Sequence, residues 1–409
     1  MKTPMLSHGV QQISKGLIAS YIFDWIVIIL IAVVGGLFAK ASPNRHPFSL
    51  TDASIAFPFV KEKVSTSTLV LVGLVAPGLI IIAVCLIFVP GPTVSKDIPK
   101  SLIWRRKLWE WNTAWLGLAL ALASAFFLTD GMKNLFGKPR PDLLSRCNPD
   151  LANFQNYAVG GRGPGEGFGS VLLVSWQICQ QKDLSILNDG FASFPSGHSS
   201  CKLFNIQWSH RLLAKRTTVS WAGLTYLTLF LCSKFAITIP YLLPQQYSSS
   251  AFPTFQSSHQ NHQNGSSSFQ PKTDTLTNSS SASLPKVLRS QAAAPPTYLL
   301  VLAFIPIGAA IYISSSRYSD FKHHGFDIIF GSLMGFLLAW GSFRWYHAPI
   351  RRGAGWSWGA RSNHKAWGVG LGVQGYAEEE HGMKADNTMQ RDIELGSSAD
   401  ASGPLRQGF

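Results

Sequence analysis

Apolar and polar residues alternate in long blocks along this chain. Six blocks are mostly apolar and are long enough to be membrane helices: residues 17–39, 68–89, 115–132, 221–239, 298–314 and 326–346. A helix needs roughly 20 apolar residues to cross a bilayer core of about 30 Å. The pattern therefore predicts an all-α, polytopic bundle of about six transmembrane helices, which occupies residues 17–346.

The composition supports this interpretation. Of the 409 residues, 46% are hydrophobic and only 14% are charged, a balance that fits a membrane protein better than two or three soluble domains. The net charge of +14 is spread between apolar blocks and accompanies no nucleic-acid motif, so we expect a bilayer as partner and no nucleic acid. The sequence carries no signal for an oligomeric state.

Polar segments lie at both ends of the chain and between the last apolar blocks. Residues 1–16 precede the first span. Residues 241–297 are rich in Ser, Gln, Asn and Thr and show no apolar period, which predicts a disordered loop. Residues 347–409 mix Gly, Trp and Arg before turning acidic, and this predicts a disordered tail.

The distribution of Lys and Arg predicts the orientation, because cytoplasmic loops carry the excess. Basic residues crowd the loop between spans two and three and follow span six: Lys96, Lys100, Arg105, Arg106, Lys107, Arg344, Arg351 and Arg352. Both termini and the 241–297 loop are then cytoplasmic, and the loop at 133–195 lies outside the cytoplasm. Asp24, near the cytoplasmic end of span one, is interpreted as an interface residue beside Trp25.

Five cysteines fit no zinc spacing, and we expect no metal site. Cys147 and Cys179 both fall in the predicted outer loop, where disulfides persist. They either pair or remain two free thiols, because sequence alone does not give connectivity.

Three polar clusters are predicted at the same outer membrane face. The first holds Lys133 and Arg140 at the end of span three, with Pro139 and Pro141 stiffening the chain around the arginine. A guanidinium presented in this way matches phosphate oxygens with two parallel hydrogen bonds. Taken alone, the cluster could equally be a basic stop at a membrane edge.

The second cluster leads toward span four and contains Ser196, Gly197 and His198. Serine favours a helix N-cap, and glycine lets backbone N–H groups approach an anion at a helix start. His198 would then be a candidate acid beside that anion. The plain alternative is a turn with a surface histidine.

The third cluster runs from the end of span five to the start of span six and contains Arg317, His323 and Asp327. If the segment is helical, His323 and Asp327 share a face, and the carboxylate can hold one ring nitrogen so that the other is free to attack phosphorus. A local ion pair at a membrane edge is the alternative. Three cations, a helix start and two histidines on one face are, however, what phosphoryl transfer requires.

The spacings Lys-x6-Arg-Pro, Pro-Ser-Gly-His and Ser-Arg-x5-His-x3-Asp resemble the three signature motifs of the type 2 phosphatidic acid phosphatase, or lipid phosphate phosphatase, family. The resemblance extends from span one to span six and is greatest to fungal phosphatases acting on diacylglycerol pyrophosphate and phosphatidate. It implies a membrane-bound hydrolase with a lipid phosphate substrate, no cofactor and no magnesium requirement.

The resemblance also implies roles for the matched residues. His323 would be the nucleophile that becomes phosphohistidine, Asp327 its orienting partner, and His198 the acid that protonates the departing alkoxide. The phosphate would be bound by Lys133, Arg140, Ser196, Gly197 and Arg317.

Two other functions remain open: a lipid phosphotransferase of the same superfamily, and a catalytically impaired relative that binds lipid. One departure from the family pattern keeps the second open. Residues 201–219 carry several cations and separate Ser200 from the apolar block at Trp221. We predict that this insert is translated intron or a gene-model error and does not belong to the working enzyme.

Overall fold

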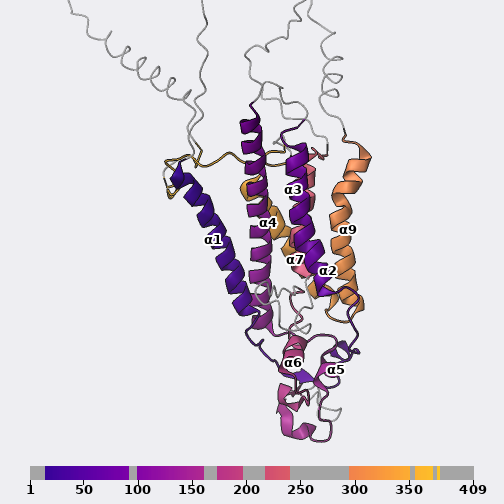
Figure 1. Cartoon of the computed structure of the whole chain (residues 1–409). Helices are drawn as coiled ribbons and strands as arrows, with labels where there is room; N and C mark the ends of the chain where they lie inside the picture. The colour runs from indigo at the N-terminus through magenta and orange to yellow at the C-terminus, as the bar shows by residue number, and fades with distance from the viewer. Residues whose placement is uncertain are drawn as a thin grey trace, which may run out of the picture.

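The computed structural model describes residues 14–91, 99–160, 173–196, 217–239, 294–350, 355–371 and 375–377. Long helices run side by side and a cap of short elements covers one end of them (Figure 1). The long elements are α1 (Lys15–Phe38), α3 (Ala76–Phe88), α4 (Lys100–Phe136), α7 (Thr217–Lys234), α9 (Thr297–Ser319) and α10 (Gly325–Tyr346). Helix α2 (Thr66–Val70) continues through the π-helical turn η2 (Leu71–Val75) into α3.

Five helices in the described part of the chain are long and apolar enough to cross a membrane: Lys15–Phe38, Ser67–Phe88, Lys100–Phe136, Thr297–Ser319 and Gly325–Tyr346. The all-α polytopic prediction is therefore confirmed. The remaining predicted span, span four at residues 221–239, corresponds to α7, which has 18 residues and carries several hydroxyl side chains. Helix α7 contacts α4, α9 and α10, so neighbouring helices rather than lipid surround much of it.

Helix α7 packs tightly because glycines remove side chains at its contacts. A Cβ atom on Gly223 would lie 2.0 Å from the carbonyl oxygen of Gly73, in η2. Large side chains then fill the remaining space, with Tyr226 and Phe230 fully buried against α4 and α10. Helix α7 also begins four residues before the predicted start at Trp221, so Thr217–Val219, the end of the expected insert, belong to a bundle helix.

The cap is built from the segment between α1 and α2 and from the predicted outer loop at 133–195. Its elements are β1 (Phe48–Ser49), η1 (Ala53–Ile55), α5 (Leu143–Cys147), η3 (Phe154–Tyr157), β2 (Ala158–Gly160), β3 (Leu173–Val174), η4 (Trp176–Ile178) and α6 (Leu184–Gly190). The strands form an antiparallel sheet in the order β1-β3-β2. A small buried core that includes Phe48, Leu143 and Phe191 joins the loops, and Cys147 and Cys179 form a disulfide.

The segment after α10 corrects a sequence-based prediction. Residues 347–409 were expected to be disordered, yet residues 355–371 lie across the end of the bundle opposite the cap. Arg361 Nη2 donates to Asp24 Oδ2 at 2.7 Å, and Ser20 Oγ donates to the carbonyl oxygen of Ala366 at 3.1 Å. Asp24 is therefore more than an interface residue: it anchors this strap, which we define as residues 355–371. The other predicted disordered segment, residues 241–297, lies outside the described residues except for its last four.

Asp24→Asn should loosen the strap, because Arg361 loses its charged acceptor. Hydrogen bonds to charged groups contribute about 1.5–3 kcal/mol, and about 1.4 kcal/mol changes an opening equilibrium tenfold. We expect trypsin to cleave after Lys365 about ten times faster in the variant, as followed by mass spectrometry in detergent. Asp52→Asn, at an exposed position of the cap between α1 and α2, is the control. Equal cleavage rates in both variants would contradict the anchoring role.

Candidate active site

The three sequence clusters meet where the cap joins the bundle. Lys133 lies in the last turn of α4, and Arg140 follows it in the loop before α5. Ser196 approaches from the loop after α6, and its backbone N–H donates to the carbonyl oxygen of Asp327, in the first turn of α10, at 3.0 Å. Arg317 lies in the last turn of α9. Gly197 and His198 lie outside the described residues.

A glycine directs the first cluster toward the site. Gly137 ends α4 in the left-handed conformation, with φ at 52°, and a Cβ there would lie 1.9 Å from the carbonyl oxygen of Asn44. Only glycine avoids both the strain and the clash. The turn sends Lys138 and Arg140 back under the cap.

His323 is buried, with 1% of its surface exposed, and it lies in the bend just before α10. Its Nδ1 is 2.8 Å from the backbone oxygen of Ser193. A carbonyl can only accept a hydrogen bond, so Nδ1 carries the proton and Nε2 keeps its lone pair in the neutral ring. This contact fixes the tautomer that a nucleophile at Nε2 needs.

The expected helical pairing of His323 with Asp327 needs correction, because α10 begins only at Gly325. Asp327 instead accepts hydrogen bonds from Lys138 Nζ at 2.7 Å and from Ser193 Oγ at 2.5 Å, and its Oδ2 lies 3.3 Å from His324 Nδ1. Asp327 thus holds Ser193 in place, and the backbone carbonyl of Ser193 in turn accepts the hydrogen bond from His323. The sequence clusters did not single out Lys138 or Ser193 for a role, and no spacing signal identifies a backbone carbonyl.

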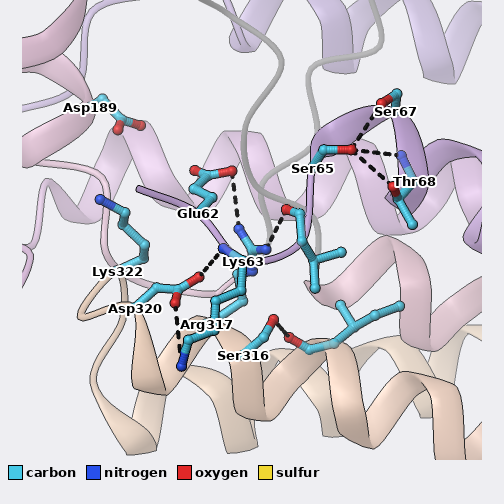
Figure 2. Close-up of polar contacts among 12 residues, drawn as sticks. Glu62, Lys63, Ser65, Ser67, Thr68, Asp189, Ser316, Arg317, Asp320 and Lys322 are labelled. Carbon is cyan, nitrogen blue, oxygen red and sulfur yellow. Dashed lines mark hydrogen bonds and ion pairs between the residues drawn. The ribbon is translucent and has the colours of Figure 1, made fainter. Parts of the chain in front are cut away.

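Both arginines of the site are fully buried, and each is only partly hydrogen-bonded. Arg140 Nη2 is 2.9 Å from Asp189 Oδ1 and also donates to the carbonyl oxygen of Ala192. Arg317 Nη2 donates to the carbonyl oxygen of Val64 at 2.7 Å, and its Nη1 is 3.2 Å from Glu62 Oε2 (Figure 2). Within the described residues, Arg140 Nη1 and Arg317 Nε have no hydrogen-bond partner.

Lys133 completes the cations of the site. It is 5% exposed, and its Nζ lies 3.7 Å from Asp130 Oδ1, one turn earlier on α4. Buried guanidinium donors without a partner are energetically unfavourable in a protein interior. Two such donors beside a buried lysine form a site that an anion would satisfy.

A chain of buried charges lies behind these cations. Asp142 accepts two hydrogen bonds from Arg146 and one from Lys322, each between 2.8 and 2.9 Å. Burial alone would raise the pKa of Asp142, but the hydrogen bonds and charges of Arg146, followed by the charges of Arg140 and Lys322, outweigh it and lower the pKa to about 2. Burial lowers the pKa of Lys322, while Asp142 opposes that shift. The hydrogen bond of 2.9 Å from Lys322 Nζ to Asp142 Oδ2 pairs the two groups.

Helix α10 allows the second cluster to approach closely. A Cβ on Gly331 would lie 2.6 Å from the carbonyl oxygen of Ser196 and 2.9 Å from Thr218 Oγ1. The same carbonyl oxygen accepts hydrogen bonds from the backbone N–H and the hydroxyl of Thr218. The absence of a side chain at position 331 therefore sets how close Ser196 lies to α10. Among the described residues, no group of three or more His, Cys, Asp and Glu side chains is placed to hold a metal ion.

A bundle of membrane-length helices is capped at one end, where buried cations lie near the buried His323. These features define a polytopic membrane protein with a candidate anion site. The PAP2 superfamily model matches residues 114–351, which is more than half of the chain, so the protein belongs to that superfamily. It is an integral membrane phosphatase. The family resemblance drawn from the three motifs is confirmed.

Several curated relatives are similar over much of their length. Diacylglycerol pyrophosphate phosphatase 1 of Saccharomyces cerevisiae is 24% identical over 329 residues, which cover 80% of each chain. Lipid phosphate phosphatase 1 of Arabidopsis thaliana is 24% identical over 396 residues, 96% of this chain and 88% of the relative. A PA-phosphatase related-family protein of Dictyostelium discoideum is 33% identical over 187 residues, but the match spans 46% of this chain and 49% of that relative. No solved structure shows significant similarity.

Gly331→Ala should destabilise the protein, because the new methyl group would press against the Ser196 carbonyl and Thr218. Overpacking of this kind costs about 1–3 kcal/mol, so the unfolding temperature in detergent should fall by several degrees. Gly341→Ala, on the same helix, is the matched control: nothing lies within 4 Å of its added Cβ. Alanine there should leave the unfolding temperature unchanged or raise it. The close approach would be disproved if the two variants unfolded at the same temperature.

Proposed function

We propose that this protein hydrolyses lipid phosphate monoesters or pyrophosphates through a phosphohistidine at His323, without a metal. The observation that carries the proposal is the hydrogen bond from His323 Nδ1–H to the Ser193 carbonyl oxygen. It puts the proton on Nδ1 and the lone pair on Nε2, in a buried site where Arg140 Nη1 and Arg317 Nε have no hydrogen-bond partner among the described residues. A fixed nucleophile next to fixed positive charge is the arrangement that phosphoryl transfer needs.

The reaction proceeds in two displacements. His323 Nε2 attacks the phosphorus atom and forms an N–P bond while the bond from phosphorus to the lipid oxygen breaks. In the proposal, His198 gives its proton to the leaving oxygen and then takes a proton from the water that cleaves the N–P bond. The products are the lipid alcohol, or a lipid monophosphate from a pyrophosphate, and inorganic phosphate, and His323 is regenerated.

The cations stabilise the charge that builds on the three non-bridging oxygens. Arg140 and Arg317 would each turn an unpartnered N–H toward these oxygens, and Lys133 would add a third positive charge. Ser196 and Gly197 would complete the binding of the phosphate through the second motif. Asp327 acts indirectly in this scheme, because it fixes Ser193 and Lys138 and not the nucleophile's ring.

The names of the relatives narrow the substrate class. One is a diacylglycerol pyrophosphate phosphatase and another a lipid phosphate phosphatase. We therefore propose phosphatidate, diacylglycerol pyrophosphate and lysophosphatidate as the substrates to test. All three present a phosphate at the end of a lipid, and the position of the candidate site, where the cap meets the membrane helices, supports binding of such a headgroup.

His323→Ala should abolish phosphate release from these three lipids, since the N–P bond can no longer form. The measurement is phosphate release by the purified protein in detergent, together with acid-labile labelling of the trapped intermediate. His364→Ala, in the strap at the opposite end of the bundle, is the control and should retain activity. Vanadate should inhibit the wild-type protein, whereas EDTA should not. Near-normal turnover by His323→Ala would refute the mechanism.

We further propose that the site faces away from the cytoplasm and that both termini lie in the cytoplasm. The Cys147–Cys179 disulfide in the cap supports this orientation, because disulfides persist outside the reducing cytosol.

The orientation predicts that the glycosylation acceptors Asn264 and Asn278, outside the described residues, stay unmodified. Expression in a eukaryotic host followed by glycosidase treatment tests this directly, and an introduced acceptor at Val159, an exposed position in the cap, is the positive control. Glycans at Asn264 or Asn278 would reverse the proposed orientation.

A further inference from the structure

An unbroken chain of ion pairs connects the loop of His323 with Arg140. Lys322 Nζ contacts Asp142 Oδ2 at 2.9 Å, and Asp142 holds Arg146 through two bonds of 2.8 Å. Arg146 Nη1 contacts Asp189 Oδ2 at 2.7 Å, and Asp189 Oδ1 contacts Arg140 Nη2 at 2.9 Å. Charges alternate along the whole chain, and its two ends are the neighbour of the proposed nucleophile and a proposed phosphate ligand.

Burial makes this chain stiff. The side chains of Lys322, Asp142, Arg146 and Arg140 are between 0% and 4% exposed, and that of Asp189 is 28% exposed. A buried charge that loses its partner pays a desolvation penalty with no compensation, so each member is confined to the geometry that satisfies both of its neighbours. Asp142 and Asp189 each bridge two cations. Moving one end of the chain therefore disturbs the other.

The chain also joins parts of the cap that are distant in sequence. Asp142 directly precedes α5, and Arg146 lies in the last turn of that helix. Asp189 lies in α6, and Lys322 lies in the bend before α10. Figure 2 shows Asp189 and Lys322 on the same side of Arg317. Cys147, the neighbour of Arg146, forms a disulfide with Cys179 and so links α5 to the residue that follows η4.

We infer that this series of ion pairs fixes the position of His323 relative to the phosphate. Lys322, at one end, and Asp189, next to Arg140 at the other end, are positioning residues. The inference rests on the proposed function. In this arrangement Lys322 holds the bend that carries the nucleophile, and Asp189 turns Arg140 so that Nη1 faces the phosphate. A displacement of about 1 Å between reacting groups reduces rates on the order of a hundredfold, so the chain should affect turnover without touching substrate.

The test is a double-mutant cycle on turnover of detergent-solubilised phosphatidate. Lys322→Gln removes one end and should lower kcat about 10- to 100-fold, with KM within about twofold of wild type. Lys322→Arg, which keeps the charge, should recover most of the rate. Asp189→Asn should lower kcat by a similar factor and also raise KM, because Arg140 loses its partner. Lys182→Gln is the matched control, because Lys182 is an exposed lysine of the cap that takes no part in the series of ion pairs. This variant should leave both kcat and KM unchanged.

The double variant decides whether the chain acts as a unit. Because either single change already separates the bend from Arg140, kcat of the double variant should resemble that of the slower single variant. A kcat loss equal to the product of the two single losses would show independent sites and overturn the inference. A Lys322→Gln protein with the kcat of the wild type would also overturn the inference. The same holds if the Lys322→Arg protein has a kcat as low as that of Lys322→Gln.

Two controls keep the outcomes distinct. If Lys322→Gln cannot be purified as a folded protein, Asp142→Glu replaces it, since it keeps the charge but lengthens the same link, and it should lower kcat with little change in KM. A wild-type protein that releases no phosphate would overturn both this inference and the proposed function. If the wild-type protein is active but the kcat losses of the two single variants multiply in the double variant, only the inference about the ion pairs is overturned.

Discussion

The central constraint on this structure is that cations must be kept charged in a place that water barely reaches. Arg140 and Arg317 are fully buried, and neither would be tolerated there without an acid. Asp189 and Glu62 supply that acid, but each contacts only part of its guanidinium. Partial compensation stabilises the buried guanidinium groups, and within the described part of the chain it leaves Arg140 Nη1 and Arg317 Nε without a hydrogen-bond partner. Under the proposed function, full compensation by a second carboxylate would leave the phosphate without these donors.

This constraint explains why the site needs the cap. The carboxylates that compensate the arginines do not come from the membrane helices: Glu62 precedes α2, and Asp142 and Asp189 belong to the cap segment between α4 and α7. The loops can hold them in place only because they share a core and a disulfide. The bundle presents the histidine and two cations at helix ends, and the cap supplies the counter-charges. The central helix α7 can carry hydroxyl groups because its neighbours, and not lipid, enclose much of it.

The sequence predicted the helices well and their partners less well. Residues 326–346 were expected as a span, and α10 is Gly325–Tyr346, because continuous apolar length is a direct signal of a membrane helix. The motif residues that the structure describes do meet at one face. The acceptor for His323 could not be predicted, since a backbone carbonyl at Ser193 has no sequence signature. The strap was missed for a related reason: Asp24 and Arg361 are 337 residues apart, and local composition does not encode a contact at that separation.

The predicted insert can now be considered from its two ends. Residues 201–216 lie outside the described residues, but Ser196 and Thr218 on either side are in contact, with the Ser196 carbonyl oxygen 2.8 Å from the Thr218 hydroxyl. Ser196 is thus hydrogen-bonded directly to the first turn of α7, as a motif placed at the start of a helix should be. Thr218 is itself fully buried, so a protein without the insert would still need a residue that donates hydrogen bonds to the Ser196 carbonyl oxygen. A working deletion should therefore end before Thr217 and not at Val219. That boundary preserves both hydrogen bonds to Ser196, whereas removal through Val219 would leave its carbonyl oxygen to find a new donor in Ser220 or Trp221.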